Sequence, residues 1–326
     1  MTALPFSSIV SVAGPALTDS EKRLFAAFSP AGFILFSRNI ETPVQLAALT
    51  RSLRETVGWH CPILIDQEGG RVARLRGPHW PEWPSAVTYG PLYGNDIVTG
   101  CAALTTDTQS IGNALTALGI DVNCAPVADV ATADMDDVLG QRCYSDNPDI
   151  VARAAQDVCH AYLDVGVIPV IKHLPGHGRA TADSHHDLPV ITASRDDLTR
   201  TDFAAFRMAL NTPHRDRIWG MAAHVLMTDI DPVHPTSLSS TVISQIIRDD
   251  IGLTGLLMGD DVDMQALRAY GDAIDRALAS VQAGCDVALY CAGSFDIVQR
   301  LAHAMPPIDD HALHRMQAAG YAVKGA

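Results

Sequence analysis

Eight short apolar segments recur along the whole chain, and this repetition constrains the fold more than any other feature. Each segment is apolar throughout instead of alternating, as expected for parallel strands that are covered on both faces. The segments are Ser8–Gly14, Gly32–Ser37, Pro62–Gln67, Val122–Val127, Val167–His173, Trp219–Val225, Leu256–Asp260 and Val287–Ala292.

Between these segments lie helical patterns with recognisable ends. Thr42 followed by Pro43 is typical of a helix start, and Gly58 marks the stop of that helix. Ser194 predicts the start of another helix, whose apolar face continues to Leu210. Strands and helices alternate eight times, which predicts an α/β protein with a (β/α)8 TIM-type barrel. The 326 residues contain no linker, repeat or low-complexity tract, so we expect a single domain over residues 1–326.

The charge and the composition argue against several classes of partner. The chain carries 23 lysines and arginines against 37 acidic residues, a net charge of −14. Such a surface repels phosphate backbones and anionic lipids, so neither nucleic acid nor a membrane is an expected partner. No apolar run approaches the roughly 20 residues that span a bilayer, and the first residues lack the pattern of a signal peptide. The seven cysteines are scattered and form no C-x-x-C pair, which is typical of reduced thiols in a cytoplasmic protein.

Polar residues stand at or just beyond several of the predicted strands. In barrels of this kind, catalysis takes place at the carboxyl ends of the strands. We therefore expect these side chains to converge on one site. They are Asp66, Asp129, Lys172, His173, His224 and Asp260.

The segment from Lys172 to His186 combines a lysine, four histidines and an aspartate directly after an apolar strand. In one interpretation Asp183 orients and polarises His185, which then acts as general acid and base. In another, both residues bind a metal ion together with His173 and His177. Histidine-rich metal sites in barrel hydrolases usually begin with a His-x-His pair on the first strand, which is absent here, so the dyad is favoured.

Glycines flank His177 in this segment, at Gly176 and Gly178. The four residues that follow are small or polar, so nothing large anchors them in a core. We therefore expect a mobile loop.

Two further clusters have both a functional and a structural interpretation. Asp66 and Arg74 are placed to recognise substrate hydroxyls, or they form an ordinary surface ion pair. Asp260, at a strand tip, is placed as a nucleophile or as an electrostatic stabiliser. Asp261 and Asp263 are more simply explained as caps of the helix that follows.

Six motifs, taken together and in their order, resemble glycoside hydrolase family 3, and within it the single-domain bacterial β-N-acetylglucosaminidases of cell-wall recycling. The most specific is the Lys-His-x-Pro-Gly-His-Gly run with Asp-Ser-His downstream. The motifs are Gly32–Ile40, Ile65–Val72, Asn123–Asp129, Lys172–His185, Ala223–Val225 and Ser237–Ser239 before Leu256–Met264.

The resemblance implies a role for each candidate residue. Asp260 would be the nucleophile, His185 the acid/base and Asp183 its partner. No metal and no cofactor would be needed. The terminal sugar would be held by Asp66, Arg74, Arg142, Lys172 and His173.

The implied enzyme is an exo-acting, retaining β-N-acetylglucosaminidase. Its substrate would be N-acetylglucosaminyl-anhydro-N-acetylmuramic acid, with or without its peptide. We expect no partner beyond this small carbohydrate or muropeptide, and a monomer or a weak homo-oligomer.

The chain departs from the family pattern at two places. Gly259 stands where a serine or threonine usually precedes the nucleophile, and Cys143-Tyr144 replaces the usual Ser-Phe after Arg142. The alternatives are another exo-acting β-glycosidase of the family, a metal-dependent amidohydrolase, and a sugar-binding regulatory protein that has lost activity.

Overall fold

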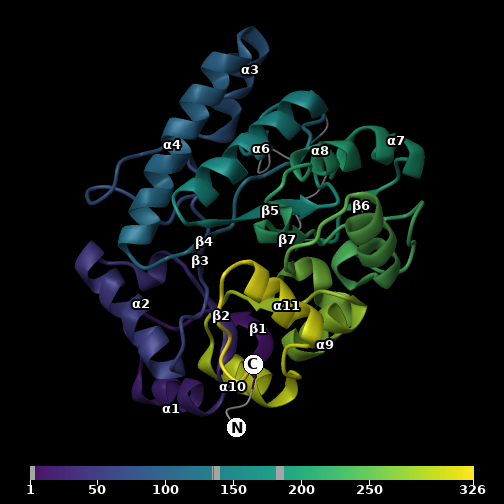
Figure 1. Cartoon of the computed structure of the whole chain (residues 1–326). Coiled ribbons are helices and arrows are strands. Elements are labelled where there is room, and N and C mark those ends of the chain that lie inside the picture. Colours follow the sequence, from purple (N-terminus) through teal and green to yellow (C-terminus); the bar gives the residue numbers. More distant parts are fainter. Residues whose placement is uncertain (1–3, 134, 136–139, 181–186) are drawn as a thin grey trace.

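A computed structural model describes residues 4–133, 135, 140–180 and 187–326 of the chain. Eight strands form a closed barrel at its centre (Figure 1). Each of them overlaps one of the eight apolar segments of the sequence. They are β1 (Phe6–Val10), β2 (Pro30–Leu35), β3 (Ile63–Ile65), β4 (Val122–Asn123), β5 (Ile168–Leu174), β7 (Trp219–Ala222), β9 (Leu257–Asp261) and β10 (Val287–Tyr290).

The order of the strands around the barrel follows the chain. The ring runs β1, β2, β3, β4, β5, β7, β9 and β10 before it returns to β1, and every neighbouring pair is parallel. A separate short pair joins β6 (Val190–Ile191) to β8 (Leu226–Met227). The predicted (β/α)8 TIM-type barrel is thus confirmed.

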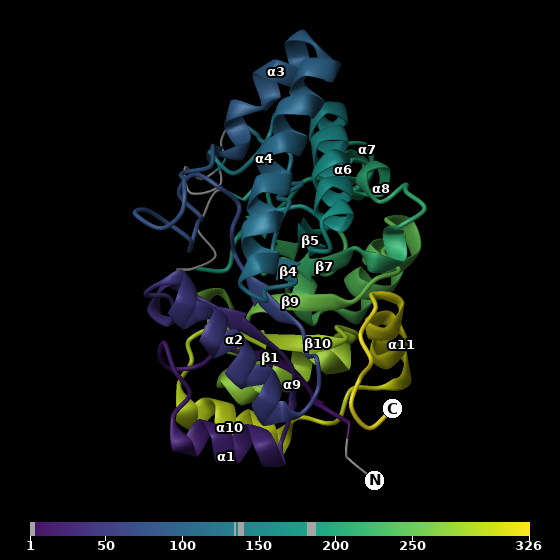
Figure 2. The ribbon, with the colours of Figure 1, turned by 60° about the vertical axis from the view of Figure 1, so that its left-hand side comes forward.

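Helices surround this barrel (Figures 1 and 2). Among the described residues, no helix is long and apolar enough to cross a membrane. The α-helices are α1 (Asp19–Ala27), α2 (Pro43–Val57), α3 (Gly90–Asn95), α4 (Ile97–Ala117), α6 (Pro148–Asp164), α7 (Arg195–Arg200), α8 (Asp202–Ala209), α9 (Ala273–Ala283), α10 (Phe295–Ala304) and α11 (Asp310–Ala318); a π-helix covers Val242–Asp250.

The helix ends show how far the local sequence decides the structure. Thr42 caps α2 by accepting a hydrogen bond from the amide of Gln45, and Gly58 ends the helix with φ at 77°. Ser194 caps α7 as predicted, but the expected single helix to Leu210 is wrong. The helix is interrupted at Thr201. Asp202 starts α8, and its carboxylate binds Arg179 from the loop after β5.

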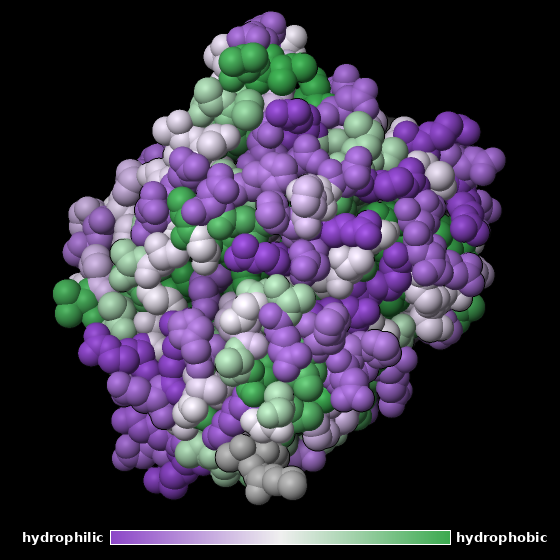
Figure 3. Space-filling view, in the orientation of Figure 1, coloured by the Kyte–Doolittle hydropathy of each residue, from purple (hydrophilic) through white to green (hydrophobic). Residues whose placement is uncertain are grey.

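The visible face of the molecule is mostly polar (Figure 3). Apolar side chains gather at the tip formed by α3 and α4, at the top of that view. Ile97 and Val98 begin α4 there and are 57% and 76% exposed.

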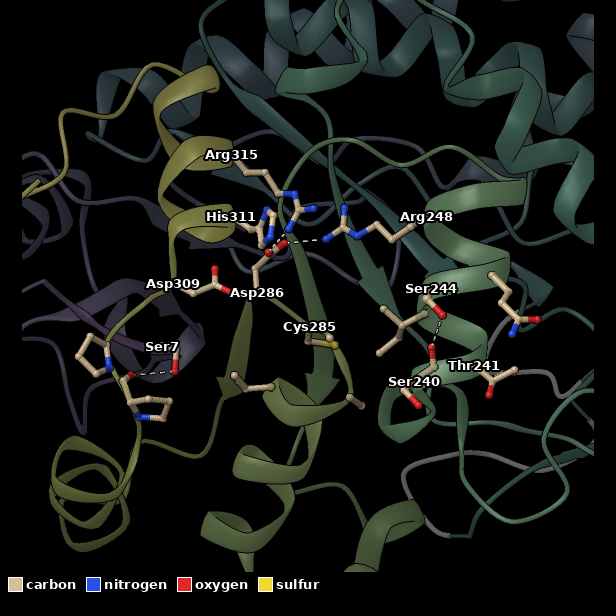
Figure 4. A pocket seen from close by; sticks show the side chains of 17 residues that line it. Ser7, Ser240, Thr241, Ser244, Arg248, Cys285, Asp286, Asp309, His311 and Arg315 are labelled. Atoms are coloured by element: carbon tan, nitrogen blue, oxygen red, sulfur yellow. Dashed lines mark hydrogen bonds and ion pairs between the residues drawn. The ribbon is translucent and has the colours of Figure 1, made fainter.

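An ion-pair clamp closes the amino-terminal end of the barrel, beside a hollow of about 640 Å³ (Figure 4). Asp286, just before β10, accepts from Arg248 of the π-helix at 2.7 Å and from Arg315 of α11. The amide of Leu257 donates to the same carboxylate at 2.7 Å. Arg248 also donates to the carbonyls of Leu253 and Gly255. These contacts pair the charged groups of Asp286, Arg248 and Arg315 with one another. The clamp thereby joins the π-helix and α11 to the amino-terminal ends of β9 and β10.

We predict that Asp286→Asn lowers the free energy of unfolding by about 3–5 kcal/mol, because two largely buried guanidinium groups lose their counter-ion. Urea titration followed by circular dichroism measures this loss. Asp309→Ala is the matched control in the same hollow: it removes only the cap of α11 and should cost about 1 kcal/mol. Equal, small losses in both variants would contradict the clamp.

Candidate active site

The residues predicted to converge do meet at the carboxyl end of the barrel. Asp66 follows β3, and Lys172 lies in β5, yet Lys172 Nζ is 3.0 Å from Asp66 Oδ1. Arg142, from the segment between β4 and α6, approaches His173 of β5 to 3.3 Å. The strand ladder shifts register between Lys172 and Leu174, where two consecutive side chains both contribute to the site.

Lys172 is the centre of a buried network of charges. It is 2% exposed, and its ammonium lies 2.7 Å from Glu68 Oε1 as well as 3.0 Å from Asp66. Burial alone would lower the pKa of Lys172, but Asp66 and Glu68 outweigh burial and raise it above its ordinary value. Arg142 binds Glu68 through Nε and Nη2, each at 2.9 Å. Burial opposes ionisation of Glu68, yet Arg142 and Lys172 lower its pKa to about 2.

Asp66 and Arg74 form the ion pair that the sequence suggested. Arg74 Nη2 lies 3.0 Å from Asp66 Oδ2, and its guanidinium stacks over the Phe36 ring, 5.2 Å from the centroid. Burial would raise the pKa of Asp66, but Lys172 and Arg74 lower it instead. Arg74 Nε is buried and has no hydrogen-bond partner among the described residues. The pair is therefore part of the barrel mouth and not an ordinary surface salt bridge.

His173 lies between the carboxylate of Asp129 and the guanidinium of Arg142. Its Nδ1 is 2.7 Å from Asp129 Oδ2, and its Nε2 faces Arg142 Nη2. A guanidinium can only donate, so Nε2 accepts and the proton lies on Nδ1, toward Asp129. Asp129 is fully buried; burial would raise its pKa, but His173 and the amide of His177 lower it.

Asp260 stands near the tip of β9, two strands from β5 around the barrel. Its Oδ1 accepts from the amide of Asp261 at 2.8 Å. Burial would raise the pKa of Asp260, but the basic groups of the site and the amide of Asp261 lower it below its ordinary value. The side chain is therefore a carboxylate near neutral pH and can act as a nucleophile or as a stabiliser of positive charge.

The predicted capping role of Asp261 and Asp263 is wrong. The 3-10 helix after them, Gln265–Tyr270, follows Met264 and has no side-chain cap. Asp261 Oδ1 instead accepts from the amides of Asp263 and Cys291, each at 3.1 Å, which ties the tip of β9 to the end of β10. Burial, and then the nearby Asp260, raise the pKa of Asp261 to about 6.

The described part of the loop after β5 packs closely against its neighbours, and the mobility expected of the whole loop stays a prediction. His177 is 4% exposed, and Arg179 binds Asp202 at 2.7 Å. A side chain at Gly178 would meet the carbonyl oxygen of Val130 at 1.8 Å, so this glycine serves close packing. The proposed dyad of Asp183 and His185 lies outside the described residues.

The sequence alone does not reveal the part that three residues play in the site. Glu68 belongs to the Ile65–Val72 motif, but it lies on a loop beyond the strand end, so the pattern assigns it no role. Asp129 and His224 are expected at strand ends, where the pattern gives them no specific function. The signal that identifies all three is a polar side chain next to an apolar strand, which alone does not say what it contacts.

A metal site is not formed by the described residues: among them, no three His, Cys, Asp or Glu side chains are arranged to hold an ion. Two of the four residues in the metal hypothesis, Asp183 and His185, lie outside this part of the chain.

Comparisons with known proteins give one consistent result. The family model "Glycosyl hydrolase family 3 N terminal domain" matches residues 8–317. A beta-hexosaminidase of Bordetella avium is 33% identical over 310 residues, which cover 94% of this chain and 87% of that protein.

Solved structures agree with this match. NagZ of Neisseria gonorrhoeae, in complex with N-trifluoroacetyl-D-glucosamine, is 30% identical with a TM-score of 0.88, over 97% of this chain and 90% of NagZ. A family 3 β-N-acetylglucosaminidase of Paenibacillus sp. str. FPU-7 is 29% identical with a TM-score of 0.82, over 96% of this chain and 59% of that chain. With its barrel, its motifs and a family match over nearly its whole length, this chain belongs to glycosyl hydrolase family 3.

Proposed function

We propose that this glycoside hydrolase removes single β-linked N-acetylglucosamine residues from the non-reducing end of peptidoglycan fragments. The observation that carries the proposal is the position of Asp260 at the tip of β9, where its Oδ1 accepts a hydrogen bond from the amide of Asp261 and its pKa is lowered although burial opposes this. The relatives support the choice of sugar, because NagZ was solved with an N-acylated glucosamine. The muropeptide aglycone follows from the sequence resemblance.

In this proposal the buried charge network holds the terminal sugar. Asp66 accepts hydrogen bonds from sugar hydroxyls, while Arg74 and Lys172 donate to them. Arg142 and His173 complete the wall of the pocket. Because Glu68 and Asp129 already fix the basic groups, these side chains lose little conformational freedom when the sugar binds.

The proposed reaction is a double displacement. Asp260 attacks the anomeric carbon, the glycosidic bond breaks, and His185 gives its proton to the leaving oxygen. Water then attacks the glycosyl ester while His185 takes the proton from that water, and Asp260 leaves as a carboxylate. Asp183 orients His185. A neutral or cationic imidazole avoids a second anion beside Asp260, and its ordinary pKa of about 6.5 suits both steps near neutrality.

A panel of chromogenic N-acetylglucosaminides, glucosides and xylosides, assayed with and without a chelator, separates this proposal from its alternatives. We expect activity on the first class only, and no loss with chelator. Preference for glucosides would indicate another β-glycosidase, loss with chelator would indicate a metal-dependent hydrolase, and binding without turnover would indicate a regulatory protein.

We predict that Asp260→Asn lowers turnover by several orders of magnitude without unfolding the protein, because covalent attack is removed. A slow-turnover fluorinated N-acetylglucosaminide should label a peptide that contains Asp260, as read by mass spectrometry. Asp263→Asn is the matched control, since this carboxylate is exposed, and it should keep its activity. A label on Asp261 or Asp263 would contradict the assignment.

For His185→Ala we expect the largest loss with poor leaving groups, because a good leaving group departs without protonation. Asp183→Asn should show the same trend more mildly, since the imidazole remains. Plots of log(kcat/KM) against leaving-group pKa measure this dependence, with the neighbouring His186→Ala as control. An equal loss on all leaving groups would assign His185 to binding or to the fold.

We expect Glu68→Gln to lower kcat/KM about 100-fold, because Lys172 and Arg142 lose a charged partner worth about 1.5–3 kcal/mol per hydrogen bond. Steady-state kinetics and the dissociation constant of N-acetylglucosamine measure the effect. Glu82→Gln, an exposed residue farther along the same segment, is the control. Wild-type kinetics in Glu68→Gln would contradict the proposed role of the network.

A further inference from the structure

His224 joins a neighbouring loop to the backbone beside the proposed nucleophile. It follows β7 and is 1% exposed. Its Nδ1 lies 2.7 Å from the hydroxyl of Ser237, and its Nε2 lies 3.0 Å from the carbonyl oxygen of Asp261. The imidazole therefore spans from the segment after β8 to the tip of β9.

The chemistry of the two partners fixes the tautomer of this imidazole. A backbone carbonyl only accepts, so Nε2 must carry the proton. Burial lowers the pKa of His224, which favours the neutral ring, although Asp260 opposes this. In a neutral ring with a proton on Nε2, Nδ1 accepts, and the hydroxyl of Ser237 donates to it. Ser237 is itself fully buried, so few other partners compete for this hydroxyl.

Asp261 transmits this contact to Asp260. Its amide donates to Asp260 Oδ1 at 2.8 Å, while its carbonyl accepts from His224. Its own carboxylate is held by the amide of Cys291. The backbone of Asp261 is thus fixed from two sides, and the amide that it presents sets the orientation of the Asp260 carboxylate.

The residue before Asp260 offers no such support. Gly259 has no side chain, and a Cβ there would lie 3.0 Å from Ser280 Oγ and 3.6 Å from Ser237 Cβ. Support for the tip of β9 therefore comes from the neighbouring elements rather than from position 259.

We propose that His224, with its tautomer set by Ser237, is a positioning residue that aligns Asp260 for attack on the anomeric carbon. This inference rests on the proposed function, in which Asp260 is the nucleophile. His224 has no contact with the sugar in this account. Its effect falls on the rate of the covalent step and not on sugar affinity.

Two amide variants of different length isolate the contact between His224 and the carbonyl of Asp261. The amide nitrogen of glutamine reaches the place of Nε2, so His224→Gln keeps the donor to Asp261. Asparagine reaches only the place of Nδ1, so His224→Asn keeps the contact with Ser237 and loses the donor to Asp261. The control is His160→Asn on the outer helix α6. His160 also contacts a hydroxyl, with its Nε2 2.8 Å from that of Thr212.

The experiment measures the rate at which the fluorinated substrate labels Asp260, and the dissociation constant of N-acetylglucosamine. We expect His224→Asn to label about 10- to 100-fold more slowly than wild type, since small misplacement of a reacting group costs up to about 100-fold. His224→Gln should stay within about 5-fold of wild type. The dissociation constants should change less than about 3-fold in both variants, and His160→Asn should match wild type.

Equal labelling rates in the Gln and Asn variants, whether high or low, would overturn the inference. If wild type itself is not labelled at Asp260, the proposed function fails, and that failure is distinct from this one. Nitrogen-15 NMR of histidine-labelled wild type keeps the inference testable if a variant does not fold, with Ser237→Ala used to assign the His224 signal by its shift. A proton on Nε2 supports the inference, and a proton on Nδ1 overturns it.

Discussion

The ammonium of Lys172, buried between two carboxylates, is the interaction on which the barrel mouth depends. It joins β5 to the loop after β3 through Asp66 and Glu68. Glu68 in turn fixes Arg142, whose other contact is His173. An isolated buried charge costs several kcal/mol, so each of these groups keeps its charge only because the others are present. These contacts hold Lys172, Arg142 and His173 in place, which is what a preorganised site requires.

This arrangement also explains why adjacent carboxylates behave differently. The Oδ1 of Asp260 accepts from the amide of Asp261, and the pKa of Asp260 is lowered although burial opposes this. Asp261, one residue later, has its pKa raised to about 6 by burial and by Asp260. A strand turns successive side chains to opposite sides, so neighbouring positions on β9 have different surroundings. Asp260 is thereby free for its proposed role as the nucleophile, whereas Asp261 ties β9 to the end of β10.

Much of the fold could be predicted from the sequence, because continuous apolar segments and helix caps are local signals. Thr42, Pro43 and Gly58 determine the ends of α2 through contacts within a few residues. The contact of Asp202, beside the helix break at Thr201, with Arg179 could not be predicted, since it joins distant segments of the chain. The same holds for the close packing of Gly178 against Val130. At the site, strand ends identified Lys172, His173 and Asp260, whereas the role of Glu68 appears only when Arg142 and Lys172 are seen around it.

The central claim is that a carboxylate in this preformed site attacks the sugar and is then displaced by water, so that two inversions restore the original configuration. Proton NMR of the first sugar released from a β-N-acetylglucosaminide, recorded before mutarotation, tests this directly. The account predicts that the β anomer of N-acetylglucosamine appears first and that the α anomer follows only by mutarotation. Initial release of the α anomer would mean a single displacement by water and would contradict a nucleophilic Asp260.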